Sequence, residues 1–214
     1  MRTTRSGSKV IRYSLGVFLW LFAVAGTTLV ALTEYSTSAA IAENERRVLL
    51  RNLHALLPRD RLDNDIATDT VEIPPSLLLG TDTEMPAYLA RRNGEPVAVV
   101  FNSIAPNGYN GRIHLLVGVY VDGSIAGVRV IKHSETPGLG DAVVVRKSRW
   151  IKGFDGKSLH DPTARGWAVK RDGGEFDQFT GATITPRAVV AAVHNTLLYY
   201  QQNADMIFAQ GGTQ

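Results

Sequence analysis

The chain opens with a long run of apolar positions. Ser14 to Leu32 contains no charged residue, and most of its side chains are large and apolar. As a helix, these nineteen residues span about 28 Å, which is close to the roughly 30 Å thickness of the hydrocarbon core of a bilayer. The pattern therefore predicts a single transmembrane helix over residues 14–33, preceded by a short basic tail over residues 1–13.

The charges on either side of this run predict its orientation. Arg2, Arg5, Lys9 and Arg12 precede it, and Glu34 is the first acidic residue of the chain. Basic residues gather on the cytoplasmic side of a membrane span. We therefore expect residues 1–13 in the cytoplasm and everything after about residue 35 on the other side of the membrane.

The same run has a second interpretation, a cleaved signal peptide, because Ala40-Ile41-Ala42 matches a small-residue cleavage site. The apolar run is longer than the apolar region of a usual signal peptide. Its length favours a retained anchor.

The next part of the chain changes from helical spacing to a polar, proline-broken stretch. Ala39 to Leu57 has apolar residues on one side and arginines on another, and Pro58 follows, which predicts a helix that ends there. Residues 60–86 are polar and contain Pro74-Pro75. We interpret residues 34–95 as a stalk helix and a connecting segment with little regular structure.

From Pro96 the spacing becomes that of strands. Pro96 to Ile104 is rich in strand-forming residues, and apolar residues alternate at period two from Ile113 to Val121. Asp122-Gly123 is a strong tight-turn signal, and Ile125 to Ile131 is expected to return as the partner strand. Trp167 to Val169 resembles a further short strand.

A helix is expected at the end of the chain. Pro186 suits the first turn of a helix and Thr185 is a plausible N-cap; apolar residues then recur at steps of three and four, at Val189, Val190, Val193, Leu197 and Leu198. Runs of strands with helices at either end predict an α+β fold with a small antiparallel sheet. We assign this domain to residues 96–202, followed by a tail over residues 203–214.

Composition excludes several classes of function. The 214-residue chain has no cysteine, which excludes disulfides, thiolate-bound iron–sulfur clusters and thioether-linked haem. Subtracting the four basic residues of the tail from the total of 23 leaves 19 against 20 acidic residues, so nucleic-acid binding is not indicated. The five histidines are scattered, and no metal site is expected. Neither a Rossmann glycine motif nor a nucleophile elbow is present.

The chemistry of the chain is concentrated in one stretch, Asp177-Gln178-Phe179-Thr180-Gly181-Ala182-Thr183-Ile184-Thr185-Pro186. Thr183 lies in the turn that enters the last helix, where unpaired N–H groups and the helix dipole favour an anion. Gly181 and Ala182 carry almost no side chain, so a bulky ligand can approach the backbone. The stretch places a hydroxyl beside a potential phosphate site.

These residues carry a resemblance to a known family. Asp177-x-x-Thr180-Gly181-Ala182-Thr183 is similar to the motif at which a flavin transferase attaches FMN, by a phosphoester, to the final threonine. The longer run FDQFTGATITPRAVV resembles the G subunit (RnfG/RsxG) of the Rnf (Rsx) electron-transport complex. A second motif supports the resemblance: in that family the segment matching Glu135, Thr136, Pro137, Gly138, Leu139 and Gly140 lies against the isoalloxazine ring.

The resemblance implies a set of flavin-binding residues. FMN would be covalent on Thr183, with Thr180, Gly181 and Ala182 beside it. Lys170 matches a family lysine near the flavin, although it is also open to interpretation as an exposed charge at the end of a strand. Asp177 is expected either to cap the backbone or to bind the magnesium ion that the transferase uses. No catalytic residue and no resident metal are expected.

The resemblance also implies a function. The chain would relay electrons, in one-electron steps, within a complex that connects ferredoxin and NAD and couples redox chemistry to Na⁺ or H⁺ transport. Its partners would be the A, B, C, D and E subunits of that complex, the flavin transferase during maturation and the bacterial inner membrane, with the FMN domain on the periplasmic side.

Three alternatives remain open from the sequence. One is the related C subunit of the sodium-translocating NADH:quinone reductase, and another is a membrane-tethered scaffold without flavin. The third is a soluble flavoenzyme, for which Glu135 stands alone as a candidate acid or base.

Overall fold

The computed structural model describes the backbone of residues 7–210 and the side chains of residues 18–38 and 40–209. The chain divides into two compact units at Val48 and Leu49. Parts of the expected tails, residues 1–6 and 211–214, lie outside the described residues. The remainder of both expected tails is helical, because α1 begins at Gly7 and α2 ends at Gln210.

The N-terminal unit consists of helix α1 (Gly7–Leu56) up to Val48. Every described side chain from Phe18 to Val48 is exposed. Within the apolar part, the hydroxyls of Thr27 and Thr33 donate hydrogen bonds to carbonyls of the preceding turn, so these polar groups are satisfied within the helix. Among the described residues α1 is the one helix long and apolar enough to cross a membrane, as the sequence predicts.

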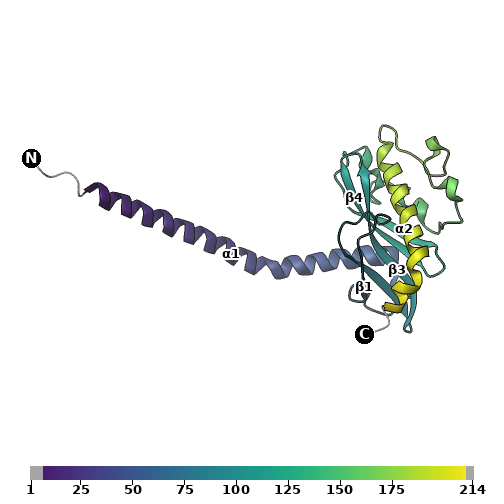
Figure 1. The fold of residues 1–214 in the computed structure, drawn as a ribbon, viewed down its shortest axis with the longest axis horizontal. Helices are drawn as coiled ribbons and strands as arrows, with labels where there is room; N and C mark the ends of the chain where they lie inside the picture. The colour runs from purple at the N-terminus through teal and green to yellow at the C-terminus, as the bar shows by residue number, and fades with distance from the viewer. Residues whose placement is uncertain (1–6, 211–214) are drawn as a thin grey trace, which may run out of the picture. The chain divides into compact units, whose positions relative to one another are not determined.

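The C-terminal unit is built on a five-stranded antiparallel sheet (Figure 1). Its strands lie in chain order, each paired with the next: β1 (Thr70–Ile73), β2 (Met85–Arg92), β3 (Glu95–Gly108), β4 (Gly111–Tyr120) and β5 (Ile125–Lys132). The period-two set Ile113, Leu115, Val117 and Val119 of β4 lies in one core, as predicted. The Asp122-Gly123 turn is also found, and Gly123 has a left-handed φ of 83°.

The two faces of the sheet are covered by different helices. Helix α2 (Ile184–Gln210) packs on one face, where Val99, Phe101, Leu115 and Val117 join its buried residues in the larger core. The last two turns of α1 and the segment after it cover the other face, where Leu53, Leu56, Leu57 and Ile66 meet the alternate side chains of β2, β3 and β4. The sheet is therefore buried on both sides, which confirms the predicted α+β architecture.

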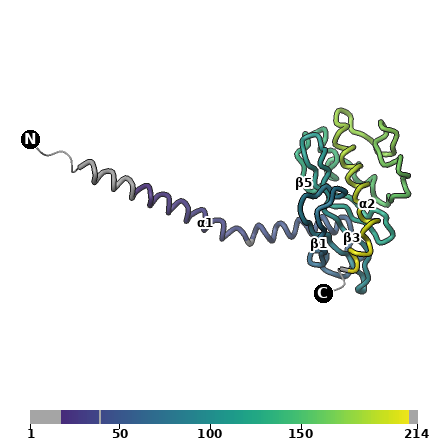
Figure 2. The backbone as a smooth tube through the Cα atoms, in the orientation of Figure 1, coloured from purple at the N-terminus to yellow at the C-terminus, as the bar shows by residue number. Residues whose placement is uncertain are grey.

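A lobe of short 3₁₀ helices connects β5 to α2, and Figure 2 follows the backbone through it. Its helices are η2 (Gly140–Val143), η3 (Trp150–Phe154), η4 (Ala164–Gly166) and η5 (Lys170–Asp172). Aromatic rings supply its core: Phe154 stacks on Phe176 with 4.6 Å between ring centroids, and Trp150 contacts Phe179 edge-on at 5.1 Å. These contacts hold the segment that leads into Thr183.

The expectation of little regular structure over residues 60–86 holds only in part, because two strand segments interrupt the irregular backbone. This segment contains β1 and the start of β2, and the compact unit begins at Leu49 rather than at residue 96. Four consecutive residues of β2, Ala87 to Ala90, are buried. A strand that is covered on both faces does not alternate between apolar and polar residues. The sequence of β2 therefore lacks the alternation from which a strand is predicted.

Two local expectations near the motifs also differ from the structure. Trp167 to Val169 is not a strand, since Val169 forms only an isolated bridge to Phe176 between η4 and η5. Thr185 is not the N-cap, because α2 begins at Ile184 and Thr183 directly precedes it. The hydroxyl of Thr185 is instead hydrogen-bonded to the carboxylate of Glu135.

Candidate flavin site

The loop after β5 places a buried carboxylate at the centre of the candidate site. Glu135 is only 4% exposed. Its Oε1 accepts a hydrogen bond from the backbone N–H of Asn110 at 3.1 Å, and its Oε2 accepts one from the hydroxyl of Thr185. Glu135 therefore contacts both the turn between β3 and β4 and the first turn of α2.

The rest of this loop forms a tight turn. Gly138 has a φ of 79°, and its N–H donates to Oδ1 of the buried Asp141 at 2.8 Å. The N–H groups of Leu139 and Asp141 both donate to the carbonyl of Thr136. The turn leaves Leu139 43% exposed, so an apolar side chain is presented at the surface by a fixed backbone.

A second turn leads into α2. Gly181 has a φ of 79°, and the N–H of Ala182 donates to the carbonyl of Phe179 at 3.1 Å. The indole N–H of Trp150 donates to the carbonyl of Asp177 at 2.7 Å. The aromatic lobe thus fixes the start of the turn, and α2 fixes its end at Thr183.

These segments enclose a cavity of about 350 Å³. It is lined by Tyr109, Glu135, Thr136, Leu139, Gly140, Gly181, Ala182, Thr183, Ile184 and Thr185. The half-buried Thr183 lies at the start of α2, where the first N–H groups of a helix have no intrahelical partner. Tyr109, Leu139 and Ile184 add exposed apolar surface to the lining. Apolar surface, a hydroxyl and a helix N-terminus, which favours an anion, form a lining that fits FMN.

The structure brings together seven of the predicted residues in this lining: Thr183, Gly181, Ala182, Glu135, Thr136, Leu139 and Gly140. Pro137 and Gly138 shape the loop without lining the cavity, and Thr180 is exposed in the neighbouring turn. Lys170 and Asp177 also lie outside the lining, where they form an exposed ion pair with 2.6 Å between Nζ and Oδ1.

Two cavity residues, Tyr109 and Ile184, are absent from the sequence prediction, and Thr185 was assigned a different role. Tyr109 lies in the turn between β3 and β4, within Gly108-Tyr109-Asn110-Gly111. That turn is recognisable in the sequence. Its position beside the motif loops is not, because Asn110 and Glu135 are 25 residues apart and meet only when the strands of the sheet pair. Ile184 follows Thr183 directly and could have been inferred from adjacency.

An ion pair and a ring contact connect the lobe of 3₁₀ helices to α2. The guanidinium of Arg187 forms two hydrogen bonds with the carboxylate of Asp172, at 2.5 and 2.7 Å, and lowers the pKa of that carboxyl. This pair ties η5 to the first turns of α2. His194, further along α2, stacks on Trp167, and burial lowers its pKa.

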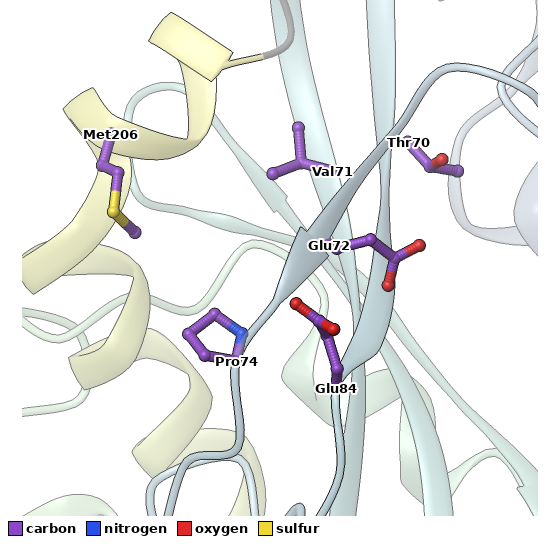
Figure 3. Close-up of a pocket in the computed structure, with 6 residues that line it drawn as sticks. All are labelled: Thr70, Val71, Glu72, Pro74, Glu84 and Met206. Atoms are coloured by element: carbon purple, nitrogen blue, oxygen red, sulfur yellow. The ribbon is translucent and has the colours of Figure 1, made fainter.

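A second cavity lies at the edge of the sheet, between β1 and the C-terminal part of α2 (Figure 3). It measures about 530 Å³ and is lined by Thr70, Val71, Glu72, Pro74, Glu84 and Met206. It contains none of the motif residues. Within the described part of the chain no group of three or more His, Cys, Asp or Glu side chains is placed to hold a metal ion.

Comparisons with known proteins agree with this geometry. The sequence model of the FMN-binding domain matches residues 108–198, and that of the RnfG N-terminal region matches residues 8–56. The first match contains both the cavity and its flanking turns. The second covers α1 almost completely.

Curated relatives match nearly the whole chain. The G subunit of the ion-translocating oxidoreductase complex of Pseudomonas aeruginosa (strain UCBPP-PA14) is 51% identical over 193 residues, covering 90% of each chain. The corresponding protein of Pseudoalteromonas atlantica is 50% identical over 194 residues, covering 91% of this chain and 90% of the relative. That of Shewanella baltica is 47% identical over 194 residues, covering 91% and 92%.

These matches favour the Rnf complex over the quinone reductase, and they account for an FMN-binding domain that follows one apolar helix. The chain belongs to the RnfG family, the G subunits of ion-translocating oxidoreductase complexes.

Proposed function

We propose that this chain carries FMN joined by a phosphoester to Thr183, and that it relays electrons as a membrane-anchored subunit of its complex. The observation that carries the proposal is the position of Thr183. It lines the cavity immediately before the first residue of α2, next to Gly181 and Ala182. A phosphate bonded to its hydroxyl oxygen would lie beside the positive end of the helix.

The cavity lining suits the rest of the cofactor. Tyr109, Leu139 and Ile184 offer apolar surface for a planar ring, and Thr136 offers a hydroxyl for its polar edge. Bound flavin accepts or donates electrons singly or in pairs, while the protein supplies orientation and electrostatics. The residues of this chain therefore bind and orient the ring and shield one side of it from water.

The predicted residues outside the lining have proposed roles at its margins. Thr180 would contact the flavin from the exposed side of its turn, and Pro137 and Gly138 would shape the loop under the ring. Lys170 is held by Asp177 close in sequence to the flavin motif. We propose that Lys170 acts on the charge of the reduced flavin, and that Asp177 binds the magnesium ion that the transferase uses during attachment.

The membrane assignment rests on α1. Its apolar part has no cover within the described structure, and the basic residues precede it. We propose that α1 crosses the bacterial inner membrane with its N-terminus in the cytoplasm and that the FMN domain lies in the periplasm. There it would exchange electrons with membrane-embedded partners among the A, B, C, D and E subunits after a flavin transferase has attached the cofactor.

Fluorescence of the denatured protein tests the attachment. The full chain is produced with the flavin transferase, denatured and separated on a gel under ultraviolet light. We expect a fluorescent band for the parent and for Thr196→Val, which lies outside the motif and the cavity lining, and none for Thr183→Val. A colourless parent, or a fluorescent Thr183→Val band, would contradict the proposal.

Isolation of the intact assembly tests the relay. The tagged chain is purified from native membranes in mild detergent, and its bound FMN is followed during reduction of the complex by its electron donor. We expect the other Rnf subunits to co-purify and the FMN absorbance to bleach on the timescale of turnover. An FMN that stays oxidised while the complex turns over would exclude the relay role.

A further inference from the structure

The carboxylate of Glu135 occupies a site built around it. Besides its two hydrogen bonds, two glycines close on its oxygens. A Cβ atom at Gly108 would lie 2.9 Å from Oε1, and one at Gly140 would lie 2.7 Å from Oε2. Contacts this short are not tolerated between a side-chain carbon and an oxygen, so the carboxylate restricts position 140 to glycine. At Gly108 the carbonyl oxygen of Gly111, 2.3 Å from the added Cβ, excludes a side chain together with the carboxylate.

The partners of Glu135 come from three separate segments of the chain. Gly108 ends β3 and Asn110 lies in the turn after it, Gly140 begins η2 after the Glu135 loop, and Thr185 is in the first turn of α2. We call these five residues, with Glu135 included, the Glu135 cluster. Its members join the three segments that line the candidate flavin cavity.

The cluster is held by hydrogen bonds alone. Across the described residues Glu135 has no cationic partner. A buried carboxyl group without hydrogen bonds is costly, so each donor is tightly constrained in position. Thr185, which is fully buried, is therefore fixed by Glu135, and Thr183 is only two residues away along the same turn.

We propose that Glu135 is a positioning residue: through Thr185 it sets the place of the Thr183 hydroxyl relative to the cavity. This inference rests on the proposed attachment of FMN at Thr183. Without the hydrogen bond between Thr185 and Glu135, the first turn of α2 can shift relative to the loop after β5. Misplacement of a reacting group by about 1 Å can reduce a rate by about 100-fold, so the rate of flavin attachment reports the position of the hydroxyl.

The chain offers a matched control for the Thr185 hydroxyl. Thr196 is also in α2 and also fully buried; its hydroxyl donates to the carbonyl of Ala192 at 2.8 Å and is hydrogen-bonded to the hydroxyl of Ser103 at 3.0 Å. It lies outside the cavity lining. Thr185→Val and Thr196→Val therefore make the same chemical change at equal burial on one helix, and only the first removes a partner of Glu135.

The experiment measures attachment and stability side by side. Full-length chain without flavin is purified in detergent and incubated with flavin transferase and its flavin substrate, and the initial rate of covalent labelling is read from the denatured band. We expect Glu135→Ala and Thr185→Val to slow labelling by about 10- to 100-fold. Thr185→Ser, which keeps the hydroxyl, should return close to the parent rate, and Thr196→Val should label at the parent rate.

The outcomes separate the inference from the proposed function. Parent chain that takes no flavin at all would defeat the attachment proposal itself. A labelled parent with equal rates in Thr185→Val would overturn the positioning role. Equal slowing in Thr185→Val and Thr196→Val, in step with their melting temperatures, would also overturn it, because the effect would then be one of stability. The Thr185 pair keeps the test valid if Glu135→Ala does not fold.

Discussion

At the scale of single residues, the site depends on glycines, which have no side chain, as much as on the residues whose side chains line it. Gly181 adopts a left-handed φ and lies against Leu139, where a Cβ would be 3.4 Å from the leucine methyl. Gly140 has no room for a Cβ between Glu135 and Thr185. Glycine is therefore needed at these two positions for different reasons: the backbone conformation at Gly181 and close packing at Gly140.

This distinction gives a prediction for Gly140→Ala. The added methyl group must displace the Glu135 carboxylate or the Thr185 hydroxyl, so we expect a loss of about 1–3 kcal/mol in the free energy of unfolding together with reduced flavin loading. The matched control is Gly153→Ala, whose Cβ would meet nothing within 4 Å. Denaturant unfolding of both variants measures the effect, and a Gly140→Ala variant as stable as Gly153→Ala would contradict the packing argument.

At the scale of elements, the end of α1 is attached to the sheet by a buried arginine. Arg129, on β5, donates to the carbonyl of Ala55 at 2.8 Å and to that of Val128 at 2.7 Å. Burial lowers its pKa and raises that of the neighbouring Asp155, which Arg129 partly offsets. Since β5 runs directly into the Glu135 loop, this contact links the last turn of α1 to the element that leads into the site.

We expect Arg129→Met to lower the free energy of unfolding by about 1–3 kcal/mol, because it leaves a helix-terminal carbonyl unpaired. Arg112→Met provides the comparison. Arg112 pairs with Asp82 at the surface, with both side chains more than half exposed, so its loss should cost less than about 1 kcal/mol. Equal losses of stability in Arg129→Met and Arg112→Met, measured by chemical denaturation, would show that the Arg129 contact does not stabilise the attachment of α1 to the sheet.

The elements also show where prediction from sequence succeeds. β4 is recognisable because Ile113, Leu115, Val117 and Val119 all lie in the larger core, with His114 and Gly118 among the residues between them. α2 repeats at helical spacing because one side packs on the sheet. β1 and β2 escape detection, since β1 has four residues and β2 is buried on both faces. Their strand character comes from pairing and coverage, which are properties of the assembled fold.

The site follows the same division. Local motifs predict that Thr183, Gly181 and Glu135 matter, and the cavity contains all three. The contribution of Tyr109, and the use of Thr185 as a donor to Glu135, arise from segments that are distant in sequence. Motifs identify residues within a segment, whereas contacts between segments require the fold.

At the scale of the whole molecule, the two units predict separable behaviour. The C-terminal unit from Leu49 onward contains both cores, while residues 18–48 bury nothing in the described structure. We expect residues 49–214 to be soluble and to unfold cooperatively, and the full chain to remain in membranes after an alkaline carbonate wash. Full-length chain released by that wash would contradict the membrane anchor.

The folded domain also predicts a pH dependence of stability. Burial lowers the pKa of His194 and of His114 in the folded state. As the pH falls through about 6.5, the unfolded chain therefore binds protons that the folded chain does not, and stability decreases. We expect the melting temperature of residues 49–214 to fall between pH 7.5 and pH 5, and to fall less in His194→Phe. An unchanged slope in that variant would contradict the assignment.

The measurement that tests the central claim most directly is the mass of one peptide. Trypsin cleaves after Arg171 and Arg187 and releases residues 172–187, which contain Thr180, Thr183 and Thr185. Fragmentation of this peptide from flavin-loaded chain should place the mass of FMN, less one water, on Thr183 alone. The same mass on Thr180 or Thr185, or an unmodified peptide from protein that still carries flavin, would contradict the account.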